Sequence, residues 1–339
     1  MPKDYLNFRL TGEAAMDWTE AASSFLADTN QQSWSLDATR SLEIPISLLP
    51  PLLKSESLVG KITRQAAEET GLPIGIPVFA GSGDFPAAIL GSGVTREDQI
   101  SDVTGTSFLL TRPVIEPLVH ADIMNVGLAS GGWGAFAVVD AAGDAIRWAS
   151  RVLDRDTRTY AKMSEEAATV EAGAEGLIFL PYLTGERLGQ GPKSRAAFLG
   201  LTAGHRSAHL HRSVMEGIVL AMKEAYQPID KKTKPASEIV SAAGGARSDL
   251  LLQIKANIFG LPIIVLEEVE AGLMGSAALA LVGLGRYASP AEAANNLVRY
   301  RPPIMPDPTM YHIYQDISGR YAAIRRLTRE LNSALEYIR

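Results

Sequence analysis

Apolar and polar residues alternate along the chain in the spacings typical of strands and helices. Short apolar runs are followed several times by a glycine-bearing turn and then by a segment with helical spacing. Strands are predicted at residues 76–80, 98–111 (two strands meeting at 104–107), 124–130, 133–139, 177–181, 198–201, 238–242 and 262–266. Helices are predicted at residues 17–26, 35–42, 57–70, 85–91, 144–153, 160–169, 207–226, 249–259, 271–284, 289–297 and 313–335. Strands that alternate with helices in this way indicate an α/β architecture.

The opening of the chain does not fit this alternation. Residues 2–13 begin with neither a strand pattern nor a helix cap, so we expect them to lie in the middle of a domain. Asp17 or Thr19 lies near the N-terminus of the helix predicted at 17–26, and the preferred interpretation of Asp17 is that of a helix cap. The 339 residues are enough for one large domain, and two are expected.

Composition narrows the class of protein. Hydrophobic residues make up 46% of the chain and charged residues 21%, which is typical of globular proteins. The net charge of -6 argues against a nucleic-acid or anionic-membrane partner. No cysteine occurs, so the chain has no disulfide, thiol nucleophile or thiolate metal site. Without a long apolar run or a signal-peptide hydrophobic segment, we expect a cytoplasmic protein.

One carboxylate, Asp84, follows the predicted strand 76–80 directly, among small residues. Aspartate is disfavoured in strands and costly to bury unpaired, so its position calls for an explanation. It is either a catalytic group at the carboxyl end of a strand or the N-cap of the helix at 85–91. The two interpretations are equally supported and compatible.

Two turns have the chemistry of anion sites. Gly105, Thr106 and Ser107 offer backbone N–H groups and hydroxyls, although an ordinary hairpin turn is the commoner fate of such a segment. Gly244 and Gly245 follow a strand, and a helix starts at Ser248 or Asp249, which suits a nucleotide phosphate. A tight strand-to-helix turn is the simpler alternative. A carboxylate near an anion-binding turn is what phosphoryl transfer to an alcohol requires.

Other polar clusters are weaker candidates. His205, His209 and His211 lack carboxylates at metal-ligand spacing, so a polar helix start is expected rather than a metal site. Glu186 and Arg187 either line a cleft or form a surface ion pair. The chain contains no G-x-x-x-x-G-K-[ST] phosphate loop, no G-x-G-x-x-G dinucleotide fingerprint and no G-x-S-x-G elbow.

These residues resemble the FGGY family of carbohydrate kinases, most nearly its xylulokinase-like branch. The family's C-terminal signature stands here as Ala196-Ala-Phe198-Leu-Gly200-Leu201, then His209-Leu210 and Ser213-Val-Met-Glu216. Further matches are the glycine-x-x-Asp segment Gly81-Ser-Gly-Asp84, the turn Gly105-Thr106-Ser107, the segment 243–248 (with Ala243 where the family often has a glycine) and the small-residue helix 271–278. The similarity covers essentially the whole chain.

The resemblance implies an actin-like, ribonuclease-H-like α/β fold with two domains around a cleft and an incomplete first domain. Residues 1–95 would form the rear of the N-terminal, sugar-binding domain, and residues 96–339 the C-terminal, nucleotide-binding domain. The family's opening strands, with their Asp-x-Gly-Thr/Ser phosphate loop, have no counterpart in this sequence. The alternatives are a fragment, one half of a split kinase whose other half acts in trans, or a degenerate paralogue.

The same resemblance implies roles for the candidate residues. Asp84 would be the general base, with Gly83 beside it at the sugar. Gly105, Thr106 and Ser107 would bind the β- and γ-phosphates of ATP, and Gly244, Gly245 and Ser248 the α-phosphate and adenosine. Mg²⁺ would bridge the phosphates through water, with no protein ligand identified. The substrate would be a pentulose such as D-xylulose, or a related ketose or polyol, and a homodimer is a further expectation. The alternatives are a non-catalytic nucleotide-binding fragment and, less favoured, an actin-like ATPase.

Overall fold

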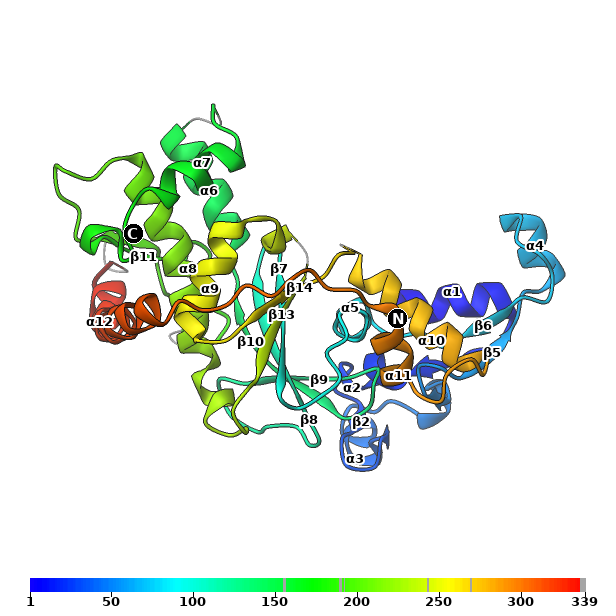
Figure 1. The fold of residues 1–339 in the computed structure, drawn as a ribbon. Coiled ribbons are helices and arrows are strands. Elements are labelled where there is room, and N and C mark those ends of the chain that lie inside the picture. The colour runs from blue at the N-terminus through cyan, green and yellow to red at the C-terminus, as the bar shows by residue number, and fades with distance from the viewer. Residues whose placement is uncertain (155–156, 189–190, 192, 243, 269, 336–339) are drawn as a thin grey trace.

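The computed structural model describes residues 1–154, 157–188, 191, 193–242, 244–268 and 270–335. The chain forms two lobes, with the N-terminus in the smaller lobe and the C-terminus in the larger one (Figure 1). We call the lobe that contains the N-terminus the first lobe and the other the second lobe. Within the described ranges, no helix is long and apolar enough to cross a membrane.

The second lobe is built on a six-stranded mixed sheet with the order β14-β13-β7-β8-β10-β9. Strands β7, β13 and β14 run parallel to one another. The neighbouring pairs β7–β8, β8–β10 and β10–β9 are antiparallel. The strands are β7 (Gln99–Thr104), β8 (Phe108–Val114), β9 (Met124–Gly127), β10 (Trp133–Val139), β13 (Glu238–Ala242) and β14 (Ile263–Val265). The chain combines this sheet with helices that follow its strands in sequence, so the predicted α/β architecture is confirmed.

Helices cover both faces of this sheet, because successive strand residues point to opposite sides. Ile239 packs in the core with α8 (Ser207–Asp230) and α9 (Asp249–Phe259), whereas its neighbour Val240 packs with α5 (Asp84–Gly91) and α10 (Ala271–Gly283). The other elements of the second lobe are α6 (Gly143–Asp154), α7 (Tyr160–Ala168), η2 (Ala174–Gly176), β11 (Ile178–Leu180), β12 (Ala197–Leu199), η3 (Gly244–Arg247) and α12 (Pro308–Leu335).

The first lobe consists of helices and two-stranded sheets. Its elements are α1 (Pro2–Thr11), β1 (Met16–Asp17), α2 (Trp18–Ala22), β2 (Ala27–Asp28), β3 (Ser33–Trp34), α3 (Leu36–Ser41), η1 (Ile46–Leu48), β4 (Leu52–Leu53), β5 (Leu58–Lys61), α4 (Arg64–Thr70), β6 (Pro77–Phe79) and α5. Helices α10 and α11 (Pro290–Leu297) come from late in the chain and pack against α5.

The contact between α5 and α10 is so close that only glycine fits. A Cβ atom on Gly275 would lie 1.9 Å from the carbonyl oxygen of Ala87. A Cβ atom on Gly91 would lie 1.8 Å from the carbonyl oxygen of Ala271. The small residues of both helices therefore allow their backbones to touch, and this contact fixes how α5 lies on the sheet.

Residues 2–11, for which the sequence showed no helix cap, form helix α1, which begins immediately after Met1 and has no side-chain cap. One local expectation was wrong. Residues 58–61 form strand β5 instead of continuing the helix expected over 57–70, because they pair with β6. Helix formation is confirmed only for the second part of that segment, as α4.

Candidate active site

Asp84 is the first residue of α5, directly after the loop that follows β6. The N-cap of α5 is Gly83, so Asp84 does not cap the helix as one interpretation expected. Its carboxylate is exposed and accepts a hydrogen bond of 2.7 Å from the backbone N–H of Phe85. A carboxylate at a helix N-terminus is favoured by the helix dipole. The structure therefore presents Asp84 to solvent, where a ligand can reach it.

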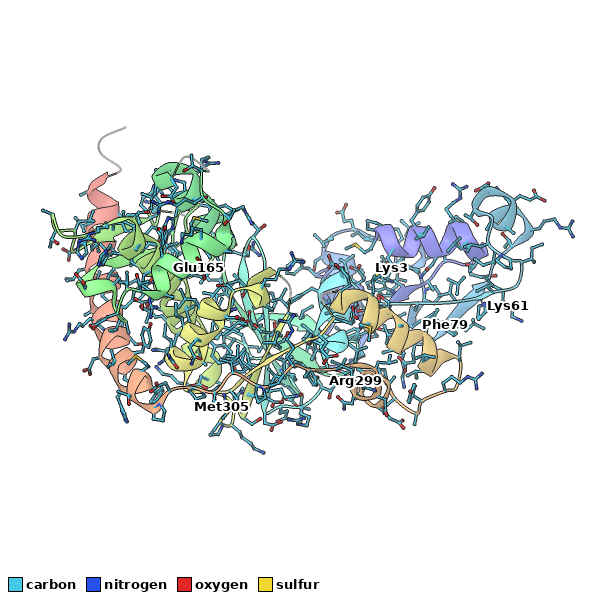
Figure 2. The ribbon with its side chains drawn as sticks, turned by 45° about the horizontal axis from the view of Figure 1, so that its top comes forward. Lys3, Lys61, Phe79, Glu165, Arg299 and Met305 are labelled. Carbon is cyan, nitrogen blue, oxygen red and sulfur yellow. The ribbon has the colours of Figure 1, made fainter. Side chains whose placement is uncertain are left out.

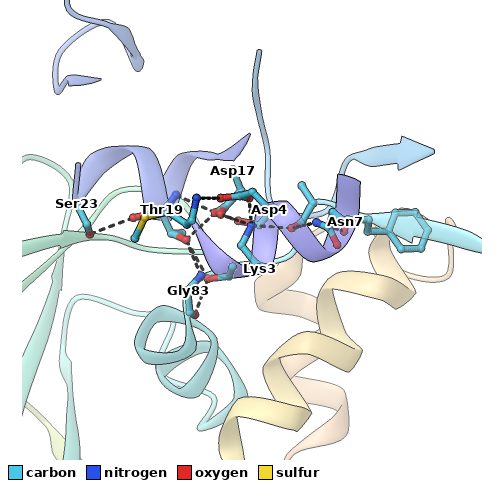
Figure 3. A network of polar contacts seen from close by, with 12 residues as sticks. Lys3, Asp4, Asn7, Asp17, Thr19, Ser23 and Gly83 are labelled. Carbon is cyan, nitrogen blue, oxygen red and sulfur yellow. Dashed lines mark hydrogen bonds and ion pairs between the residues drawn. The ribbon is translucent and has the colours of Figure 1, made fainter. Parts of the chain in front are cut away.

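A buried polar network supports the loop before Asp84 (Figure 3). The side chain of Asp17 is fully buried and lies 3.0 Å from Lys3 Nζ. The hydroxyl of Thr19 donates to Asp17 Oδ2 over 2.6 Å and accepts the backbone N–H of Gly83 over 2.9 Å. Lys3 also donates to the carbonyl oxygen of Ala80 over 2.9 Å. We call Lys3, Asp17 and Thr19 the Asp17 cluster.

The expectation that Asp17 caps a helix is confirmed, since it accepts the backbone N–H of Thr19 over 2.8 Å. Its second contribution, supporting the loop 80–83, was not visible in the sequence. The contact joins Thr19 to Gly83 over 64 positions of sequence, so no local pattern reports it.

The two predicted anion turns meet at one cavity of about 690 Å³ in the second lobe. Gly105, Gly244, Gly245 and Ser248 all line it. The described residues that line it are Thr104, Gly105, Gly143, Ile146, Arg147, Tyr160, Ala161, Ser164, Glu165, Ala168, Gly244, Gly245, Arg247, Ser248, Asp249, Leu250 and Leu251. Ala243 lies outside the described residues.

Thr106 and Ser107 are not part of this lining, and their hydroxyls contact the protein. Arg147 donates to Thr106 Oγ1 over 3.1 Å, and the Ser107 hydroxyl donates to the carbonyl oxygen of Asp140 over 2.9 Å. The Thr106 carbonyl accepts the backbone N–H of Ala142 over 3.0 Å. These contacts hold the turn against the start of α6, with Gly105 at the cavity.

Glycines at the cavity allow backbone segments to approach each other. A Cβ atom on Gly245 would lie 2.5 Å from Thr104 Cβ, and one on Gly143 would lie 2.1 Å from the carbonyl oxygen of Gly105. Ser248 is the N-cap of α9, where its hydroxyl accepts the backbone N–H of Leu251 over 3.3 Å. The helix start expected at Ser248 or Asp249 is therefore confirmed.

The cavity wall contains residues that the sequence analysis missed. Arg147 brings a guanidinium, and Tyr160 brings an aromatic ring. These side chains come from α6 and α7, together with Ser164 and Glu165. Nothing in the local sequence distinguishes them from other helical positions, because only the tertiary fold brings α7 next to α9.

Asp84 does not line the cavity. It lies on α5, which packs on the opposite face of the sheet from α9. Figure 2 shows Glu165 of the cavity wall in one lobe and Lys3 of the Asp17 cluster in the other. The structure thus forms two separate groups of candidate residues, one in each lobe.

The histidines expected at a polar helix start lie there. His209 Nδ1 accepts the backbone N–H of Arg206 over 3.1 Å at the start of α8. His211 Nε2 lies 2.5 Å from Asp154 Oδ2, and both side chains are buried. Among the residues that the structure describes, no three histidine, aspartate or glutamate side chains are placed to hold a metal ion.

Both alternatives for the loop 182–187 hold. Arg187 forms an ion pair of 2.8 Å with Asp140, and Glu186 forms one with Arg325 of α12. Glu186 and Asp140 also line a smaller cavity of about 100 Å³.

Comparisons with known proteins agree with this arrangement. The C-terminal domain of the FGGY family of carbohydrate kinases matches residues 102–284, and the N-terminal domain of that family matches residues 1–91. Xylulose kinase of Bacillus subtilis (strain 168) is 30% identical, over 100% of this chain and 68% of that protein. Crystal structures of ligand-bound xylulose kinase and of gluconate kinase, both from Lactobacillus acidophilus, superpose with TM-scores of 0.91 and 0.92. They are 27% and 26% identical, and the matches cover 96% and 98% of this chain and 67% and 68% of those chains.

The fold and the glycine-lined cavity define a two-lobed α/β protein of the actin-like ATPase class, as predicted. The chain belongs to the FGGY family of carbohydrate kinases. It is therefore a sugar kinase, in a family whose members use ATP as the phosphate donor. The resemblance drawn from the sequence is confirmed.

Proposed function

We propose that this chain transfers the γ-phosphoryl group of ATP to a hydroxyl of a pentulose such as D-xylulose, or of a related ketose or polyol. The observation that carries this proposal is an exposed carboxylate, Asp84, at the start of α5, directly after a loop that the Asp17 cluster holds. The names of the xylulose kinase relatives support the pentulose class. ATP as the donor supports a cytoplasmic location.

In the proposed mechanism, Asp84 accepts the proton of the sugar hydroxyl as that oxygen attacks the γ-phosphorus. An exposed carboxylate beside a backbone loop can reach such a hydroxyl, and Gly83, the residue before it, is assigned to the same sugar site. Residues 1–95 are assigned to sugar binding and residues 96–339 to nucleotide binding, with α10 packing back onto the first lobe.

The 690 Å³ cavity is large enough for a nucleotide. Gly105, with Thr106 and Ser107 in the same turn, is assigned to the β- and γ-phosphates. Gly244 and Gly245 are assigned to the α-phosphate. The nucleoside is placed between α7 and α9, beside Ser248. The Arg147 guanidinium also lies at this wall, where it pairs with Asp144 and contacts the Thr106 hydroxyl.

We assign magnesium to the phosphates of the bound nucleotide, without a protein ligand. Because the described residues offer no cluster of three metal-ligating side chains, phosphate oxygens and water would supply its coordination. When bound, the ion neutralises charge on the phosphates.

A second candidate function is a nucleotide-binding subunit that needs a partner. Large apolar side chains are exposed on the first lobe, including Tyr5 (61%), Leu6 (58%) and Ile74 (61%). Its sheets have only two strands each, so their edges are open to a further polypeptide. The partner would be a second copy, or an N-terminal kinase fragment in trans.

ADP release from Mg-ATP, with and without a panel of ketoses and polyols, tests both functions. Asp84→Asn should lower sugar-dependent turnover by roughly 10²–10⁴-fold, because the general base is lost. Asp37→Asn, at an aspartate whose side chain is 97% exposed, is the matched control and should behave as wild type. Turnover retained by Asp84→Asn would refute the assignment. Nucleotide binding without any sugar-dependent release would favour the subunit function.

A further inference from the structure

A lysine is buried beneath the proposed phosphate turn. Lys255 lies within α9, and its side chain is only 1% exposed. Its Nζ donates to Asp102 Oδ2 over 2.5 Å and to Thr104 Oγ1 over 2.8 Å. It also lies 4.5 Å from the centroid of the Phe108 ring. The ammonium group is therefore fully surrounded by protein.

The carboxylate of Asp102 also accepts hydrogen bonds from two hydroxyl groups. The Thr104 hydroxyl donates to Asp102 Oδ1 over 2.6 Å, and the Ser241 hydroxyl donates to Asp102 Oδ2. Asp102 and Ser241 are fully buried, and Thr104 is 3% exposed. We call Lys255, Asp102, Thr104 and Ser241 the Lys255 cluster.

This cluster joins the three elements that lead into the cavity. Strand β7 contributes Asp102 and Thr104 and continues into Gly105. Strand β13 contributes Ser241 and continues toward Gly244 and Gly245. Helix α9 contributes Lys255, and the first residues of α9 line the cavity wall. One polar cluster thus sets the relative positions of all three segments.

Stability alone does not account for a charge in this place. A buried ion pair contributes little compared with apolar side chains of similar volume, because both ions lose their hydration. Polar contacts are directional, however, and they fix the orientation of the groups that they join. Thr104 is the last residue of β7, so its hydroxyl bonds fix the end of the strand from which the Gly105 turn continues. Within that turn the Gly105 N–H donates to the carbonyl oxygen of Ser107 over 2.8 Å.

We propose that Lys255 is a positioning residue for nucleotide binding, which acts through Asp102 and Thr104 to hold the Gly105 turn in place for a phosphate. This inference rests on the proposed nucleotide site in the 690 Å³ cavity. Lys255 itself does not touch the cavity. Its loss should weaken binding of the phosphates and leave binding of the nucleoside unchanged.

The experiment measures the dissociation constants of ADP and of adenosine by calorimetry. The double variant Asp102→Asn/Lys255→Met removes both charges together and so leaves no unpaired buried ion. We expect its Kd for ADP to rise about 10-fold or more, equivalent to the loss of one charge-assisted contact, with its Kd for adenosine unchanged. Thr104→Val keeps the ion pair and the side-chain shape, and should weaken ADP binding in the same selective way.

Ile218→Val, in the core of α8, serves as the control for a general loss of stability, since Ile218 is 1% exposed and remote in sequence from the turn. Unchanged ADP binding by the folded variants would overturn the inference, as would equal weakening of ADP and adenosine, because that result indicates a purely structural role. If the double variant does not fold, Thr104→Val decides the question by the same criteria. Failure of the wild-type chain to bind ADP would instead overturn the proposed nucleotide site, and this inference with it.

Discussion

Replacement of Gly275 by alanine tests whether the contact between α5 and α10 positions Asp84. The new Cβ atom would lie 1.9 Å from the carbonyl oxygen of Ala87 and 2.8 Å from its carbonyl carbon. Both atoms belong to the backbone of α5, so neither can turn away as the end of a flexible side chain can. The two helices must therefore separate.

The size of the effect follows from these distances. Because real Cβ contacts essentially never fall below 3.0 Å, the helices must move apart by about 1 Å or more. Overpacking of this kind typically costs about 1–3 kcal/mol, and the better helix propensity of alanine offsets at most about 1 kcal/mol. Asp84 begins α5, so a shift of about 1 Å moves its carboxylate and should reduce turnover on the order of 10²-fold.

Urea unfolding and sugar-dependent ADP release measure the two effects separately. Gly272→Ala is the matched control, because it lies in the same helix and its Cβ atom would meet nothing within 4 Å. This control should keep wild-type turnover, and its stability should change by less than about 1 kcal/mol. If Gly275→Ala lost stability but kept its turnover, the helix contact would not position Asp84. If it lost neither, the close contact itself would be refuted.

Two ion pairs and the nucleotide cavity have further testable consequences. Lys3→Met should lower the free energy of unfolding by about 3 kcal/mol, measured in urea, because it removes the cation from the buried Asp17 carboxylate; an unchanged midpoint would contradict this. Burial raises the pKa of Glu224 above its ordinary value, against the opposing effect of Arg325. The folded state then holds this proton more tightly, so the stability that it contributes at low pH is lost as the pH rises through the folded pKa. Glu224→Gln cannot ionise, and thermal unfolding from about pH 4 to 7 should show wild type losing stability relative to this variant; parallel curves would refute the assignment. ADP at about 100 times its Kd should stabilise the chain by about 2.7 kcal/mol in thermal unfolding, and no shift would argue against the cavity as the nucleotide site.

The elements predicted well are those whose ends have local signals. Helix α9 begins at the N-cap Ser248 and ends at Gly260, which has the left-handed φ of 70° that favours glycine. Strand β13 before it is a short apolar run bounded by polar residues. By contrast, β5 is held by its pairing with β6, and α1 begins without a cap. Long-range pairing and missing end signals are therefore what the sequence pattern failed to report.

The residues of the candidate site likewise include some that local sequence signals predict and others that only long-range contacts reveal. Glycines and hydroxyls in turns are visible in the sequence because their backbone chemistry is local, and four of these residues meet at one cavity. Lys255 was missed because a lysine in an amphipathic helix is normally assigned to solvent. Its partner Asp102 lies 153 positions away in the chain. Only the packed fold shows that this lysine is buried and paired.

The two candidate loops share one type of support. In the first lobe, Lys3 pairs with Asp17, and the Thr19 hydroxyl joins that carboxylate to the loop 80–83. In the second lobe, Lys255 pairs with Asp102, and the Thr104 hydroxyl joins that pair to the Gly105 turn.

Loops that expose their backbone to a ligand have few apolar contacts of their own, so their orientation must come from directional bonds beneath them. The two supports differ in solvent access, since the Lys3 side chain is 22% exposed and that of Lys255 is 1% exposed. Water and salt screen the first pair more effectively than the second. The loop before Asp84 is therefore held by the more solvent-accessible of the two supports, and its position should depend more on salt concentration than that of the Gly105 turn.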